Sequence, residues 1–133
     1  MVTLTPEQRR LLEEPNLAHI CTLMNDGSPQ STPLWVDFDG EYVLVNTAEG
    51  RQKAVNLHRD PRVTLSVVDR NQLTRYVEIR GRVVDFIHDG AYDHLTRLAK
   101  KYAGPDARNP APPQEVRVIL KIEPQHVSGM GLS

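Results

Sequence analysis

The chain has little cysteine, little net charge and no long apolar run. Its 133 residues include one cysteine, Cys21, so an internal disulfide is excluded and a reducing, cytoplasmic setting is expected. Lys and Arg number 16 against 17 Asp and Glu. This balance favours neither nucleic acid nor an anionic membrane as a partner. No apolar run approaches membrane-spanning length, and the N-terminus lacks the apolar core of a signal peptide.

Motifs of the common catalytic and metal sites are also absent. The five histidines have no metal-ligand spacing with one another or with Cys21, and Asp93-His94 is expected to be a solvated pair on a helix surface. The chain contains no nucleophile elbow, Walker loop or spaced glycine triplet. Any site must therefore be found in the local pattern of the chain.

The apolar residues alternate with a period of two over much of the chain. This pattern predicts six strands, near residues 17–24, 30–38, 42–47, 63–67, 76–83 and 116–122. Short helices are predicted after Thr5, within residues 46–60 and from Asp89 to Gly104. Residues 103–114 are expected to form a proline-rich loop and 127–131 a small-residue tail. The fold class is therefore mainly β (α+β), a single domain over residues 1–133, with an antiparallel barrel and short flanking helices.

One strand contains an irregularity at Pro33. Proline cannot donate to a ladder, so it marks an edge or a bulge within residues 30–38. Leu34 and Trp35 beside it are most simply core or interface residues. They could also flank a flat ring, with Gln30 and Thr32 supplying polar contacts.

The segment from Asn46 to Asp60 predicts a strand end, a turn and a helix start. Gly50 precedes Arg51 and Lys53, which fall in the first turn of a short helix that ends before Pro61. Cations at a helix N-terminus are unfavourable unless an anion offsets them. Arg can bind a phosphate with two parallel hydrogen bonds, and Lys acts as a point charge. The two residues are either solvated surface cations or part of an anion pocket.

Three segments together resemble one family. Residues 26–33, 45–57 and 59–63, followed by Glu78-x-x-Gly81 and residues 126–129, are similar to the split β-barrel flavin-binding superfamily that includes pyridoxamine 5′-phosphate oxidase. Within it the pattern is most similar to the actinobacterial deazaflavin-dependent reductases of the B branch. The resemblance implies a six-stranded split barrel that forms a homodimer, with the cofactor in a groove between the protomers.

The resemblance also implies which residues bind the cofactor. The strand around Pro33 would lie along the ring, and the Arg51 segment would hold the phosphate of the cofactor side chain. A separate hypothesis is that Tyr76 or Trp35 gates the substrate side. The implied cofactor-binding residues are Gln30, Ser31, Thr32, Pro33, Leu34, Trp35, Asn46, Thr47, Gly50, Arg51, Gln52, Lys53, Asn56 and Tyr76.

The implied activity is hydride transfer from reduced coenzyme F420, an 8-hydroxy-5-deazaflavin, to an unsaturated small molecule. No side chain is predicted to be catalytic, and no metal is expected. Two alternatives stay open: an FMN-dependent oxidoreductase on the same barrel, and a non-enzymatic carrier of F420 or flavin. The C-terminal part lacks the Arg-x-His of the vitamin B6 oxidases, so that activity is not expected.

Overall fold

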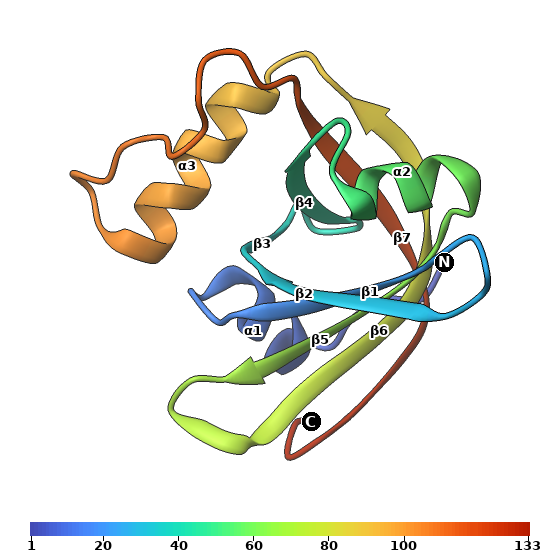
Figure 1. The fold of residues 1–133 in the computed structure, drawn as a ribbon. Helices are drawn as coiled ribbons and strands as arrows, with labels where there is room; N and C mark the ends of the chain where they lie inside the picture. Colours follow the sequence, from blue (N-terminus) through green and yellow to red (C-terminus); the bar gives the residue numbers. More distant parts are fainter.

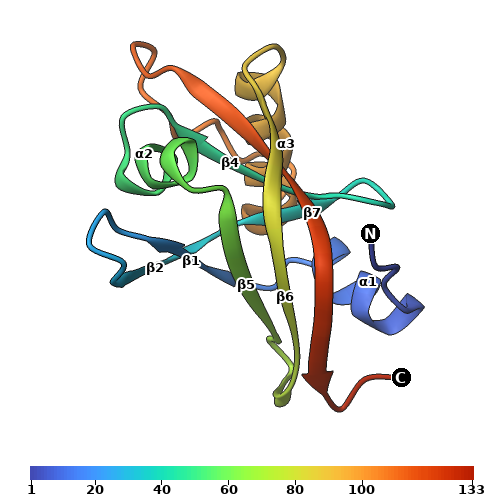
Figure 2. The ribbon, with the colours of Figure 1, turned by 90° about the vertical axis from the view of Figure 1, so that its right-hand side faces the viewer.

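A computed structural model describes all residues 1–133 as a curved antiparallel sheet with three helices around it (Figures 1 and 2). The sheet has seven strands in the order β2-β1-β5-β6-β7-β4-β3 and forms a half-barrel. The strands are β1 (Ala18–Leu23), β2 (Pro29–Leu34), β3 (Val36–Phe38), β4 (Val43–Ala48), β5 (Arg62–Asp69), β6 (Gln72–Ile87) and β7 (Arg117–Met130). The helices are α1 (Pro6–Glu13), α2 (Gln52–Arg59) and α3 (Ala91–Ala103). None of them is long and apolar enough to cross a membrane.

The prediction of six strands is wrong by one, because the predicted strand over 30–38 is two strands. β2 pairs with β1 at one edge of the sheet, whereas β3 pairs with β4 at the other edge. The division falls at Trp35, between the two strands. The next amide, that of Val36, donates to the Tyr102 hydroxyl of α3 at 3.0 Å instead of to a strand. The chain itself therefore joins the two edges of the half-barrel at this corner.

The core fills the concave side of the sheet. It contains 19 buried apolar residues, with Ile20, Leu65, Ile79 and Leu120 at most 1% exposed. Helix α1 contributes its two buried leucines to this core and lies against β3 and β5. The predicted cap of α1 is confirmed, because the Thr5 and Gln8 side chains each accept a hydrogen bond from the other residue's backbone N–H.

β6 and β7 extend well beyond their predicted bounds, as the long strands in Figure 2 show. The predicted tail at 127–131 is wrong for its first four residues, which pair with β6 up to Tyr76 opposite Met130. A Cβ on Gly129 would lie 2.2 Å from the Tyr76 carbonyl oxygen, so the close approach of the strands requires glycine there. Helix α3 is capped by Gly90, at φ 76°, one residue after the predicted Asp89.

Candidate functional site

The first turn of α2 has free hydrogen-bond donors. β4 ends at Ala48, Gly50 turns the chain with φ 90°, and α2 begins at Gln52, so the predicted strand end, turn and helix are confirmed. Lys53 lies in the first turn as predicted, whereas Arg51 has an extended backbone and is the residue just before the helix. No side chain caps the helix, and its first turn contains no acidic residue. The backbone N–H groups of residues 52–54 donate to nothing in the chain. Together with the positive end of the helix dipole, these donors suit an anion.

Three cationic side chains lie beside this turn, and two of them share one carboxylate. Arg51 Nη2 lies 3.1 Å from Glu115 Oε2, and the other oxygen of Glu115 accepts from Arg117 Nη1 at 2.9 Å. Lys53 is half-buried and forms no ion pair. Burial lowers the pKa of Lys53, and the charges of Arg51 and Arg117 lower it further. The positive charge exceeds the negative charge here, which fits a bound phosphate.

A cavity of about 390 Å³ lies next to these charges. One wall is the β2–β3 corner, with Pro33, Leu34 and Trp35, and the other walls include Leu95 of α3 and the proline-rich loop 110–112. Arg51, Glu115 and Arg117 line the same cavity. Ligand pockets commonly have this size and this mixture of apolar walls with a few polar groups. A flat ring with a phosphate-bearing side chain therefore fits the residues present.

Helix α3 contacts the corner of this cavity through an aromatic pair. The Trp35 ring stacks on Tyr102 with the ring centroids 5.4 Å apart and the planes 14° from parallel. The Tyr102 hydroxyl also donates to the Asn16 carbonyl at 2.7 Å. Trp35 is consequently held in place on one face by α3.

Three other predicted residues hold α2 against the sheet. Asn56 is fully buried and donates to Thr22 Oγ1 at 3.0 Å, and Gln52 donates to Asn56 Oδ1 at 2.8 Å. Thr22 in turn donates to Gln30 Oε1 at 3.2 Å. These contacts bring Gln30, Gln52 and Asn56 together, and all three position the helix whose N-terminus carries the free donors.

The remaining predicted cofactor-binding residues lie on different strands. Thr47 is buried in β4, and Ser31 is exposed on β2. Thr32 has a buried hydroxyl oxygen without a hydrogen-bond partner. Tyr76 lies on β6, three positions from β2 in the strand order, and does not line the cavity.

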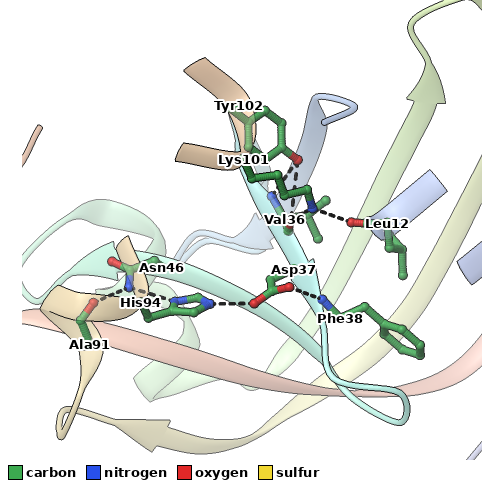
Figure 3. Close-up of polar contacts among 9 residues, drawn as sticks. All are labelled: Leu12, Val36, Asp37, Phe38, Asn46, Ala91, His94, Lys101 and Tyr102. Atoms are coloured by element: carbon green, nitrogen blue, oxygen red, sulfur yellow. Dashed lines mark hydrogen bonds and ion pairs between the residues drawn. The ribbon is translucent and has the colours of Figure 1, made fainter. Parts of the chain in front are cut away.

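Asn46 and His94 form a buried polar bridge that the sequence did not predict (Figure 3). Asn46 Nδ2 donates to the Ala91 carbonyl at 2.8 Å and to His94 Nδ1 at 3.0 Å. His94 Nδ1 therefore accepts, and Nε2 donates to Asp37 Oδ2 at 3.0 Å. The expectation of a solvated His94 is wrong, because the residue is 1% exposed. Its position in the apolar stripe of α3, one residue before Leu95, was the available signal.

Arg117 and Glu115 were also missed. Arg117 donates from Nε to Asn46 Oδ1 at 3.0 Å, so the bridge reaches the charged cluster. Burial lowers the pKa of Arg117, and Glu115 partly opposes this. Within the sequence these residues only flank a strand start, and nothing local relates them to Arg51.

Asp37 should make the stability of the protein depend on pH. Burial raises the pKa of Asp37, but the hydrogen bonds from His94 and the Phe38 N–H, with the charge of Lys101, bring it below its usual 3.8. A lowered folded-state pKa stabilises the fold above about pH 4, and this contribution disappears as the pH falls through that lower value. We expect the free energy of unfolding to fall more steeply below about pH 4 in the unaltered chain than in Asp37→Asn. Urea denaturation at several pH values measures this, and parallel pH profiles would contradict it.

Comparisons with known proteins agree with this fold. A model of the pyridoxamine 5′-phosphate oxidase family matches residues 4–131. A solved structure named F420 reductase is 34% identical, with a TM-score of 0.84 over 94% of this chain and 98% of that one. A conserved hypothetical protein from Mycobacterium tuberculosis is 22% identical, with a TM-score of 0.68 over 96% and 85% of the two chains. General Stress Protein 26 from Bacillus anthracis is 17% identical, with a TM-score of 0.66 over 92% and 90%. No curated protein matches the chain in sequence.

Proposed function

The chain belongs to the pyridoxamine 5′-phosphate oxidase family, and from this premise we propose that it is a coenzyme F420-dependent reductase of an unsaturated small molecule. The similarity to an F420 reductase supports the deazaflavin over FMN. The observation that carries the proposal is the position of the free α2 donors and their cations beside an apolar cavity.

The chain would hold the cofactor at two points. The N–H groups of residues 52–54, with Arg51 and Lys53, would bind the phosphate of its side chain. The apolar walls at Pro33–Trp35 and Leu95 would hold the ring and exclude water. When bound, a reduced deazaflavin supplies the hydride, so the residues of the chain bind and orient rather than transfer protons.

A second copy of the chain completes this proposed site. Tyr76 lies on β6, away from the cavity of its own chain, and it could reach a cofactor only in a groove shared with a partner. A homodimer would have twice the 15.0 kDa mass of one chain. Sedimentation equilibrium would measure this, and a monomer at all concentrations would remove the shared groove.

The cofactor assignment is tested by the colour and the binding properties of the purified protein. We expect a preparation without the yellow of bound FMN, and a saturable fluorescence change when coenzyme F420 is added. The same titration is carried out with FMN for comparison. Tight FMN binding without any response to F420 would contradict the proposal in favour of the FMN alternative.

The activity needs a separate assay. Oxidation of reduced F420 is followed in the presence of a panel of enones and quinones, because hydride transfer leaves no motif of its own. Turnover with at least one acceptor is expected. Binding without turnover across the panel would favour a cofactor carrier.

A further inference from the structure

Arg117 reaches the α2 turn from a different part of the chain. In the register of β4 and β7, Arg117 is paired with Ala48, the last residue before the turn that leads to Arg51. Strand pairing thus places a third cation beside the first turn of α2. Burial is the main reason that the pKa of Lys53 is lowered, and the charges of Arg51 and then Arg117 lower it further.

The guanidinium of Arg117 has donors that nothing in the chain uses. Its Nε donates to Asn46 and its Nη1 to Glu115, whereas Nη2 has no partner. The side chain is only 10% exposed and lines the cavity. An arginine carries five N–H donors, and those on Nη2 are accessible from the cavity, because Nη2 is not among the buried atoms that lack a partner. These free donors therefore suit a ligand in the cavity.

Asn46 determines where the guanidinium lies. Its Oδ1 accepts from Arg117, and its Nδ2 donates to the Ala91 carbonyl and to His94 Nδ1. Rotating the amide by half a turn would set its oxygen against the Ala91 carbonyl, which can only accept. His94 is held in turn by Asp37 (Figure 3). The amide orientation and the position of Arg117 Nε are consequently fixed by buried contacts.

We propose that Arg117 is a third ligand of the anion site, beside Arg51 and Lys53, and that Asn46 is its positioning residue. The identification of the anion as the cofactor phosphate rests on the proposed function. Arg51 and Arg117 share the single carboxylate of Glu115, and Lys53 beside them has no carboxylate partner. Two positive charges are left uncompensated, so the site takes a doubly charged anion: a phosphate monoester, or a phosphate with a carboxylate next to it.

Inorganic phosphate tests this inference on the unaltered chain. The probe is titrated while two-dimensional ¹H–¹⁵N NMR spectra record the backbone amides of residues 52–54 and the Nε–H of Arg117. We expect both sets of signals to shift with the same dissociation constant. Shifts of the α2 amides with no response of the Arg117 signal would overturn the role of Arg117 and leave the anion site in place.

Two substitutions separate binding from positioning. Arg117→Gln should weaken phosphate binding about tenfold or more, the effect of losing hydrogen bonds to a charged group. Arg97→Gln, an exposed site on α3 with the same loss of charge, should leave binding unchanged. Asn46→Ala should weaken binding severalfold and shift the Arg117 Nε–H signal before any phosphate is added. An unchanged affinity in Arg117→Gln would overturn the inference.

Titration with F420 and FMN distinguishes a failure of the proposed function from a failure of the inference about Arg117. Phosphate shifts at Arg117 without any response to F420 or FMN would support the anion site and reject the proposed cofactors. The absence of phosphate shifts at all of these positions would reject both the third ligand and the anion site.

Discussion

Replacing Gly81 with alanine is expected to destabilise the protein by about 3 kcal/mol or more, at the upper end for an overpacked core. A Cβ at this position would lie 2.0 Å from the carbonyl oxygen and 3.0 Å from the carbonyl carbon of Glu123. Both atoms belong to the backbone of β7, so no side-chain rotation relieves the clash. Gly81 also lies at a bulge, where it pairs with Pro124 while Arg80 pairs with His126. Separating β6 and β7 there would disturb the longest pair of strands in the sheet.

Gly27→Ala is the matched control for this prediction. Gly27 has φ 86° and no atom within 4 Å of an added Cβ. Alanine there causes no clash, so only the strain of its left-handed backbone conformation should lower the free energy of unfolding, by about 1–2 kcal/mol. Urea denaturation of both variants gives the two free energies of unfolding. A Gly81→Ala variant no less stable than Gly27→Ala would show that the strands move apart readily.

Lys53→Met is expected to weaken cofactor binding without weakening the fold. Loss of a hydrogen bond to a charged group corresponds to about 1.5–3 kcal/mol, or about 10- to 150-fold in the dissociation constant. In the chain by itself Lys53 is half-buried, lies near two other cations and has no carboxylate partner. Removing its charge should leave the free energy of unfolding unchanged or raise it, as occurs at sites where function opposes stability. Arg51→Ala should weaken binding by a similar amount.

Two measurements on the same variants decide this second prediction. F420 titration gives the dissociation constant, and urea denaturation of the cofactor-free protein gives stability. Lys100→Met, on the exposed side of α3, removes the same charge away from the site and should change neither. Unchanged dissociation constants in both Lys53→Met and Arg51→Ala would remove the anion assignment, and a clear loss of stability would mark Lys53 as structural.

The sequence by itself determined the features that depend on neighbouring residues. The turn at Gly50, the end of α2 before Pro61 and the cap at Thr5 each follow from the conformations open to one or two residues and from local hydrogen bonds. Alternation with a period of two likewise shows which face of a strand is apolar. The candidate anion site could be found because all of its predicted donors lie within a few residues of one another.

Only the tertiary structure decided which distant segments meet. The alternation of residues 30–38 predicted one strand with an irregularity at Pro33, yet the chain changes from one edge of the sheet to the other at Trp35, where the Val36 amide donates to Tyr102. Arg117 is held near the candidate anion site by a hydrogen bond to Asn46, 71 residues earlier. Local periodicity shows which face of each strand is apolar, but it does not show which other strand pairs with it. The register between β4 and β7 therefore had to be known before the third cation could be recognised.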